Sequence, residues 1–267
     1  MIKLIIFTDL DGTLLDHHDY SFEPARAALE RIRAAGFPLI INSSKTLAEI
    51  VSIRSALQNT DPFIVENGGA IVSPPGMCPD ASRPYVIETL GADHETIRRV
   101  LQSLRADEGF RFRGMSDMTT SEVAELTGLS LDEAAKAKDR LCSEPLVWED
   151  SQAARVRFTA LIEAQHLRLV QGGRFLHVMG DTDKAIAMEK LTARYRESEP
   201  DKEIITVALG DSPNDSAMLD VADIAVVIPA ANGTQLKPGA REVIYPSAPG
   251  PTGWNQAMNP LLDRFGA

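Results

Sequence analysis

The stretch Phe7-Thr8-Asp9-Leu10-Asp11-Gly12-Thr13 places the tightest constraint on how this chain can fold. The apolar residues from Leu4 to Phe7 predict a short buried strand that leads into it. Alternation along a strand puts Asp9 and Asp11 on one face, where two carboxylates repel each other unless a cation lies between them or one carries a proton. Gly12 allows the backbone to turn at this point. Because core packing does not require an acidic pair, we interpret it as a divalent-metal site with a carboxylate nucleophile rather than as a simple polar turn.

Composition and charge limit the possible classes of function. A chain of 267 residues with 44% hydrophobic and 24% charged residues is typical of a soluble globular protein with one large or two ordinary domains. The net charge of -11 disfavours nucleic acid and anionic membranes as partners, but allows a small anionic substrate that metal and one or two cations neutralise. Cys78 and Cys142 could pair, but only two cysteines in a chain of this length indicate reduced thiols and a cytoplasmic location. No apolar run is long enough for a signal or a membrane span.

The order of the expected elements indicates an α/β fold. Apolar runs and helical spacing predict a helix over 24–35, a strand over 38–42, a helix over 47–57, and strands over 63–65 and 70–72 around an Asn-Gly turn. This alternation predicts a mostly parallel, doubly wound sheet with helices on both faces.

The pattern changes after residue 72. Segment 73–84 is rich in proline, as linkers are, and short strands and helices mix from 85 to 178. A helix over 183–196 and strands over 204–209 and 224–227 resume the first pattern. We therefore predict a catalytic core over 1–82 plus 179–267 and an inserted α/β domain over 83–178.

Reactive side chains follow three of the core strands, and one begins a helix. They are Asp9 and Asp11, Ser43, Asp211 and Asp215, and at the helix start Lys184. Ligands of an open parallel sheet bind beyond the carboxyl ends of its strands, so we expect these side chains to converge. Taken singly, each has a structural explanation, such as a helix cap or a solvated charge. Their combination favours catalysis.

The chemistry that needs this set is phosphoryl transfer through an aspartyl-phosphate. A carboxylate attacks phosphorus, which splits one difficult step into two easier ones. Mg²⁺ held by Asp9 and Asp211 would screen the nucleophile and bind a phosphate oxygen. Ser43 and Lys184 would hold the other phosphate oxygens. Asp11 would protonate the leaving alkoxide and then activate water.

The four motifs resemble the signature motifs of haloacid-dehalogenase-superfamily phosphatases. That resemblance implies a Rossmann-like core with a C2-type α/β cap inserted between the second and third motifs. It makes Asp9 the nucleophile and Asp11 the acid/base, which also offers a backbone carbonyl to Mg²⁺. The remaining implied residues bind phosphate (Ser43, Ser44 and Lys184), lie on the metal side (Asp211 and Asp215) or accompany them in the last motif (Asn214).

Longer motifs at 43–46, 112–119, 140–145 and 172–177 are similar to those of mannosyl-3-phosphoglycerate phosphatases. They imply hydrolysis of a mannosyl- or glucosyl-3-phosphoglycerate to the glycosylglycerate, a compatible solute. We expect the enzyme to be a monomer or a homodimer. Candidate cap residues are three arginines for the glycerate carboxylate (Arg113, Arg140 and Arg174) and three hydrogen-bonding residues for the sugar (Ser143, Glu144 and His177). Alternatively, Arg140 would only pair with Asp139 or Glu144, and His177 would face outward from its strand.

Four other functions compete with this interpretation. A sugar phosphatase of broader range or a sugar phosphomutase would use the same aspartyl-phosphate chemistry. A phospho-acceptor module of receiver type also places acids, a hydroxyl and a lysine on a parallel sheet, but it lacks an inserted cap. A catalytically inactive binding protein is disfavoured because every motif residue is present.

Overall fold

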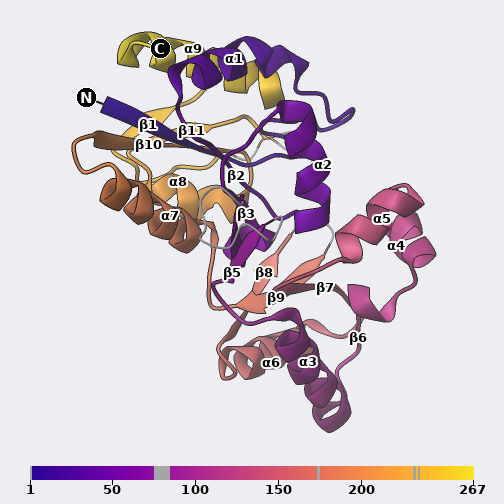
Figure 1. Cartoon of the computed structure of the whole chain (residues 1–267). Coiled ribbons are helices and arrows are strands. Elements are labelled where there is room, and N and C mark those ends of the chain that lie inside the picture. Colours follow the sequence, from indigo (N-terminus) through magenta and orange to yellow (C-terminus); the bar gives the residue numbers. More distant parts are fainter. Residues whose placement is uncertain (1, 75–84, 173–174, 231–232, 234) are drawn as a thin grey trace. The chain divides into compact units, whose positions relative to one another are not determined.

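The computed structural model describes residues 2–74, 85–172, 175–230, 233 and 235–267, and these form two compact units (Figure 1). The first unit comprises Met1–Ser43, Asp61–Ile64 and Asp183–Ala267, and the second comprises Ser44–Thr60 and Val65–Thr182. The first unit is thus smaller than the predicted core of 1–82 plus 179–267, since 44–60 and 65–82 belong to the second. The assignment of catalytic and specificity roles to two domains stays a prediction.

The first unit is built on parallel strands in the order β12-β11-β10-β1-β2-β3. Their bounds are β1 Ile2–Thr8, β2 Leu39–Asn42, β3 Phe63–Val65, β10 Glu203–Gly210, β11 Ile224–Val227 and β12 Glu242–Ile244. The chain runs outward from β1 through β2 to β3 and, later, from β10 through β11 to β12. The direction of winding therefore reverses between β1 and β10, which is where ligands of doubly wound sheets bind.

Helices cover both faces of this parallel sheet (Figure 1). Helix α1 (Arg26–Ala35), preceded by the 3₁₀ turn η1 (Glu23–Ala25), packs with α9 (Gly250–Phe265) on one face. Helices α7 (Lys184–Ser198) and α8 (Ser216–Val221) pack together on the other. The central strands read as continuous apolar runs because both of their faces are buried. The predicted doubly wound α/β class is confirmed.

No element was predicted after residue 227, yet β12 and α9 follow there. Helix α9 contains Pro251, Gly253 and Pro260, residues that usually interrupt helices. Tertiary packing overrides this weak local propensity, since α9 buries Trp254, Met258, Leu261 and Leu262.

The second unit contains an antiparallel sheet in the order β6-β7-β9-β8 and the antiparallel strands β4 and β5, which are the last two in the order of the eight-stranded sheet. The strand bounds are β4 Ala70–Ser73, β5 Val86–Thr89, β6 Phe112–Gly114, β7 Ser143–Trp148, β8 Leu167–Gln171 and β9 Leu176–Gly180. Its helices are α2 Leu47–Leu57, α3 His94–Glu108, α4 Thr120–Thr127, α5 Leu131–Lys138 and α6 Gln152–Glu163, with 3₁₀ turns η2 Glu66–Gly68 and η4 Met115–Asp117. The sequence pattern predicts a helix over 131–141 and a strand over 146–148 here; α5 ends earlier, at Lys138, and β7 begins earlier, at Ser143.

The antiparallel sheet has one face packed against α3 and α6. Phe112, Leu146 and Val178 on that face share a core with Ile97 of α3 and Phe158 of α6. The alternation along β7 and β9 puts neighbouring residues on the opposite face, which is how this sheet can bury one side and present polar groups on the other. No helix in the described ranges combines the length and apolar character needed to cross a membrane.

Candidate active site

The carboxyl ends of β1, β2 and β10 lie side by side. Thr8 of β1 pairs with Ile41 of β2 and with Leu209 of β10, so the residues that follow the three strands emerge at one edge of the sheet. They are Asp9 and Asp11 after β1, Ser43 after β2 and Asp211 after β10. The expected convergence of the core motifs at one edge is therefore observed within the first unit.

The turn after β1 brings its backbone against the acid that follows β10. Leu10 O accepts hydrogen bonds from Thr13 N (3.1 Å) and Leu15 N (2.8 Å), which close the turn. Gly12 lies in the left-handed region (φ 78°), and a Cβ there would be 2.8 Å from Asp211 Oδ2. Thr13 Oγ1 donates to Asp211 Oδ1 (3.0 Å). Glycine at 12 thus allows both the turn and the close approach.

Lys184 forms the centre of a buried ion cluster. Its Nζ lies 2.7 Å from Asp9 Oδ1 and 2.6 Å from Asp215 Oδ1, and the lysine is fully buried. The second Asp215 oxygen accepts the N–H groups of Asp211 (3.1 Å) and Ser212 (3.0 Å). Asp215 therefore fixes both the lysine and the loop that carries Asp211.

The protonation of the acids follows from their surroundings. Burial raises the pKa of Asp9 to about 7, against the lowering effect of Lys184 and with further repulsion from Asp215 and Asp11. Burial and the Asp215 charge raise the pKa of Asp211 to about 6. Burial acts to lower the pKa of Lys184, but Asp215 and Asp9 outweigh it and raise that pKa. Lysine is thus held as a cation, while the acids carry more negative charge than it balances.

The residues at this edge fit a hard divalent cation. One carboxylate oxygen from each of Asp9, Asp211 and Asp215 lies within 4.8 Å of the others. Oxygen donors of this kind are the ligands that Mg²⁺ prefers, and a dication would offset the burial and the mutual repulsion that raise the pKa values of Asp9 and Asp211. Of the other candidates, Ser43 is buried, with its N–H bonded to Ile64 O (3.2 Å), and Asn214 accepts a hydrogen bond from Ser212 Oγ.

Candidate residues of the second unit divide between the two faces of its sheet. Ser143 and His177 lie on the face opposite the α3–α6 core, since His177 pairs with Pro145, two residues after Ser143. His177 is buried, and burial together with the charge of Arg140 lowers its pKa to about 3, so the imidazole is neutral. Its Nδ1 has no hydrogen-bond partner among the described residues.

Arg140 makes hydrogen bonds but no ion pair in the described ranges. Its Nε donates to Ala137 O (2.8 Å) and its Nη1 to Ser44 O (3.1 Å), and it forms no salt bridge with Asp139 or Glu144. Carbonyl oxygens do not neutralise the guanidinium, so its positive charge is available to an anion. Ser44, a predicted phosphate binder, is placed by this contact in the second unit.

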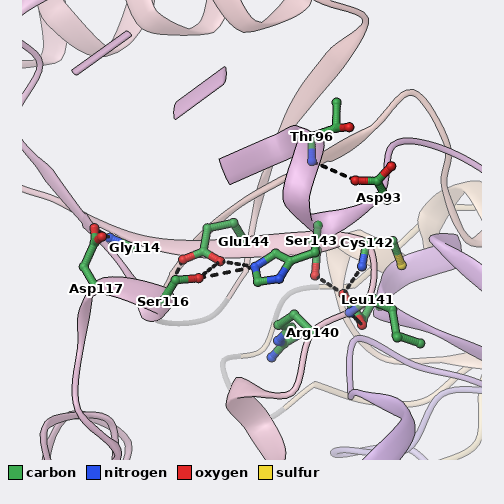
Figure 2. Close-up of polar contacts among 12 residues, drawn as sticks. Asp93, Thr96, Gly114, Ser116, Asp117, Arg140, Leu141, Cys142, Ser143 and Glu144 are labelled. Atoms are coloured by element: carbon green, nitrogen blue, oxygen red, sulfur yellow. Dashed lines mark hydrogen bonds and ion pairs between the residues drawn. The ribbon is translucent and has the colours of Figure 1, made fainter. Parts of the chain in front are cut away.

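Glu144 lies on the face of β7 that packs against α3 and α6, and its carboxylate already has hydrogen-bond partners (Figure 2). Its oxygens accept Ser116 N (2.8 Å) and Ser116 Oγ (2.6 Å), and His94 Nε2 lies 2.6 Å away. A sugar hydroxyl would have to compete with these three contacts. Arg113 is half-exposed and pairs with Glu149 (2.9 Å), and Arg174 lies outside the described residues.

Glu66 was not among the predicted site residues. This fully buried carboxylate accepts hydrogen bonds from Leu141 N (2.7 Å), Cys142 N (3.1 Å) and Ser143 Oγ (2.6 Å), donors that Figure 2 shows converging. The sequence does hold a signal, because a glutamate that directly follows an apolar strand is placed to be buried. It was interpreted only as the start of an Asn-Gly turn.

Known proteins share this fold and much of this sequence. The model of the haloacid dehalogenase-like hydrolases matches residues 6–119. Two glucosyl-3-phosphoglycerate/mannosyl-3-phosphoglycerate phosphatases, from Persephonella marina and Methanococcoides burtonii, are 38% and 37% identical to this chain. Each match covers 98% of this chain and 98% of the relative. A solved haloacid dehalogenase-like hydrolase from Bacteroides thetaiotaomicron aligns with a TM-score of 0.66 at 18% identity, over 98% of this chain and all of that one.

The solved structure supports the fold over nearly the whole chain, and the two relatives match the sequence over the same length. The chain belongs to the haloacid dehalogenase-like hydrolases and, within them, to the phosphatases.

Proposed function

We propose that this phosphatase hydrolyses a glycosyl-3-phosphoglycerate, with mannose or glucose as the sugar, through an aspartyl-phosphate on Asp9 and with Mg²⁺ as cofactor. The observation that carries the proposal is the buried Asp9–Lys184–Asp215 cluster at the switch point of the sheet, 2.7 and 2.6 Å from lysine to each acid. The substrate class is supported by the names of the two relatives, which match over nearly the whole chain.

In the first step, a carboxylate oxygen of Asp9 attacks phosphorus, and the bond from phosphorus to the glyceryl oxygen breaks. Lys184 favours the ionised, nucleophilic form of Asp9 and balances charge that develops on the phosphoryl oxygens. Ser43 and Ser44 would hold the remaining phosphoryl oxygens. Asp11 gives its proton to the leaving alkoxide, which departs as the neutral alcohol.

In the second step, Asp11 accepts a proton from water, and the resulting hydroxide attacks the phosphorus of the aspartyl-phosphate. The bond to Asp9 breaks, inorganic phosphate leaves, and both aspartates return to their starting states. A phosphomutase would replace this water by a second sugar hydroxyl.

The carboxylates of Asp9 and Asp211 would hold the cation. The backbone carbonyl of Asp11 and the carboxylate of Asp215 would also contribute. When bound, Mg²⁺ supplies charge neutralisation between the nucleophile and the phosphoryl group. Asp215 keeps Lys184 and the Asp211 loop in place, since both of its oxygens are used in hydrogen bonds to them.

In the second unit, Arg140 would bind the glycerate carboxylate, because it is a half-buried cation bonded only to carbonyls in the described ranges. His177 and Ser143 would contact the sugar from the polar face of the sheet. For Glu144 we propose a structural role instead, since it joins β7 to Ser116 and His94.

The direct experiment measures phosphate release with Mg²⁺ across glycosyl-3-phosphoglycerates, 3-phosphoglycerate and common sugar phosphates. We expect kcat/KM to be greatest for mannosyl- or glucosyl-3-phosphoglycerate. Equal turnover of all esters would contradict the proposed substrate and favour a broad sugar phosphatase, and phosphoryl transfer to a sugar without phosphate release would reveal a mutase.

Arg140→Ala tests the carboxylate contact. We expect kcat/KM for the glycosyl-3-phosphoglycerate to fall by about 100-fold, the value of a charge-assisted hydrogen bond of about 3 kcal/mol, and that for p-nitrophenyl phosphate to fall far less. Equal losses on the two substrates would argue against recognition of the carboxylate by Arg140.

A further inference from the structure

We propose that Glu66 is a positioning residue that sets substrate preference by holding the segment 140–143, and with it Arg140, in its binding conformation. This inference rests on the proposed function, because it assigns Arg140 to the carboxylate of the substrate. Glu66 would act through hydrogen bonds within the second unit and would not touch the substrate.

The contacts of Glu66 converge on one short segment. Glu66 Oε1 accepts Leu141 N (2.7 Å), and Oε2 accepts both Cys142 N (3.1 Å) and Ser143 Oγ (2.6 Å). The carboxylate is fully buried, and three donors from consecutive residues satisfy it. Ser143 is the first residue of β7, so Glu66 fixes the point at which the chain enters that strand.

The turn that carries Glu66 is itself held tightly. Glu66 has a left-handed backbone (φ 51°), which residues other than glycine and asparagine rarely adopt and which persists only when the surroundings enforce it. Gly69, at the end of the turn, approaches so closely that a Cβ there would collide with Cys142 Sγ. Gly68 O accepts Thr182 Oγ1 (3.0 Å), and Gly69 O accepts Leu90 N (2.9 Å). The turn is therefore a rigid support for the segment beside it.

The support extends to Arg140 through its neighbour. Leu141 is fixed at both backbone groups, since its N–H bonds to Glu66 and its carbonyl accepts His94 N (2.8 Å). Arg140 precedes this pinned residue, and its own side chain bonds to the carbonyls of Ala137 and Ser44. Loss of the Glu66 contacts would free residues 140–143 to shift, and the guanidinium would shift with them.

The chemistry of the site requires a carboxylate and not merely a side chain of this size. An ionised carboxylate only accepts hydrogen bonds, and all three partners here are donors. In a Glu66→Gln variant the amide NH₂ would face at least one of these donors, so one hydrogen bond would become a repulsive donor–donor contact. This variant changes the hydrogen bonding with little change in volume.

The experiment compares KM for the preferred glycosyl-3-phosphoglycerate with KM for p-nitrophenyl phosphate, which has no carboxylate on its leaving group. We expect Glu66→Gln to raise the first about tenfold more than the second. In an Arg140→Ala background the same change should alter the ratio less than about twofold, because the two residues act as one unit. An unchanged ratio, or full additivity of the two variants, would overturn the inference and leave Glu66 with a structural role.

The matched control is Asp223→Asn. Asp223 accepts Thr206 N (2.8 Å) and Thr206 Oγ1 (2.8 Å), so it also supports backbone through a carboxylate, but it lies in the first unit. We expect this variant to lower thermal stability without changing the KM ratio. If Glu66→Gln does not fold, Glu66→Asp keeps the carboxylate but shortens its reach to Leu141 N and Ser143 Oγ, and a ratio that it leaves unchanged would likewise overturn the inference.

Failure of the proposed function would be visible separately. Wild-type enzyme that turns over no glycosyl-3-phosphoglycerate would reject the substrate assignment. In that case the inhibition constant of 3-phosphoglycerate against p-nitrophenyl phosphate hydrolysis reports on carboxylate binding directly. A constant that rises about tenfold in Glu66→Gln would support the positioning role, and one that does not change would overturn it.

Discussion

Lys184 lies fully buried between two carboxylates, and its charge is what makes their burial tolerable. A buried ion pair contributes little net stability compared with an apolar core, but removal of one partner leaves an uncompensated charge. The lysine therefore links stability and chemistry at one residue, because the acid that it stabilises is the proposed nucleophile.

Lys184→Ala should lower the free energy of unfolding by about 3–5 kcal/mol at pH 8 in a chelator. The loss should be smaller at pH 5, where the unpaired acids can take up protons. Denaturant unfolding measures both values. Lys202→Ala is the control: this half-exposed lysine pairs with Glu199, and its removal should cost about 0.5 kcal/mol. Similar losses in the two variants would contradict the role of the buried lysine.

At the level of residues, the sequence allows prediction of the site residues that directly follow apolar strands. Asp9, Asp11 and Asp211 follow apolar strands directly, so their arrival at one sheet edge was predictable from strand ends alone. Glu66 was not, because its partners at 141–143 lie far along the chain and only the folded structure brings them to it. The contacts of the Glu144 carboxylate with His94 and Ser116 could not be predicted for the same reason.

At the level of elements, the tight turn after β1 decides whether the acids can meet. Gly12 has φ 78°, and its Cα faces Asp211 Oδ2 with no room for a methyl group. The end of α1 provides a comparison within the same unit. Gly36 also has a positive φ (68°), but a Cβ there would meet nothing within 4 Å.

Gly12→Ala and Gly36→Ala should therefore have different effects on phosphate release. Both variants place a residue with a side chain in the left-handed region, which should lower the free energy of unfolding by roughly 1 kcal/mol. Only Gly12→Ala should also displace Asp211, which we expect to lower kcat/KM by about 100-fold and to weaken Mg²⁺ dependence. Steady-state kinetics and thermal unfolding distinguish the two costs. Equal activity in both variants would show that the turn geometry does not matter.

Element prediction failed mainly at the C-terminus. Apolar periodicity found the strands and helices up to residue 227, but α9 was missed because it carries prolines and glycines. Its stability comes from contacts such as that of Trp254, which is buried and donates to Thr8 Oγ1 (3.1 Å), directly before the proposed nucleophile Asp9. Contacts between residues so far apart in the chain depend on the fold and cannot be predicted from the local sequence.

At the scale of the whole molecule, the acidic site makes stability depend on pH and on divalent cations. The pKa of Asp9 is raised from 3.8 to about 7, and that of Asp211 from 3.8 to about 6. Across this range the native state keeps protons that the unfolded chain has lost. Stability must then fall as pH rises, by at most about 1.4 kcal/mol per pH unit for each retained proton. Acids whose pKa is lowered, such as Asp93 through its bond from Thr96 N, act in the opposite sense and only in more acidic solution.

We therefore expect the melting temperature in a chelator to decrease from pH 5 to pH 8. Added Mg²⁺ should restore it, with a larger effect at pH 8, where the acids are ionised and bind the cation. Thermal unfolding at several pH values with and without Mg²⁺ measures this. The double variant Asp9→Asn/Asp211→Asn should lose both the pH slope and the Mg²⁺ effect. Retention of the full Mg²⁺ effect in that variant would place the cation elsewhere.

The boundaries of the two compact units could not be predicted from the sequence. The compact units divide at 43–44, 61–64 and 182–183, whereas composition suggested boundaries near the proline-rich segment and residue 179. Helix α2 illustrates why: it belongs with the second unit, where Thr46, the residue that caps it, donates to Lys136 O (2.8 Å). A pattern of alternating strands and helices does not reveal which neighbour a helix will join.

Covalent trapping of the phosphoryl group tests the central claim most directly. In Asp11→Asn, p-nitrophenyl phosphate should still transfer its phosphoryl group, because its leaving group needs no acid, while hydrolysis slows for want of a base. Mass spectrometry of the acid-quenched protein should then find one phosphoryl group on the peptide containing Asp9, and none when Asp9→Asn is added. A phosphoryl group on another residue, or turnover that persists in the Asp9→Asn protein, would contradict the mechanism.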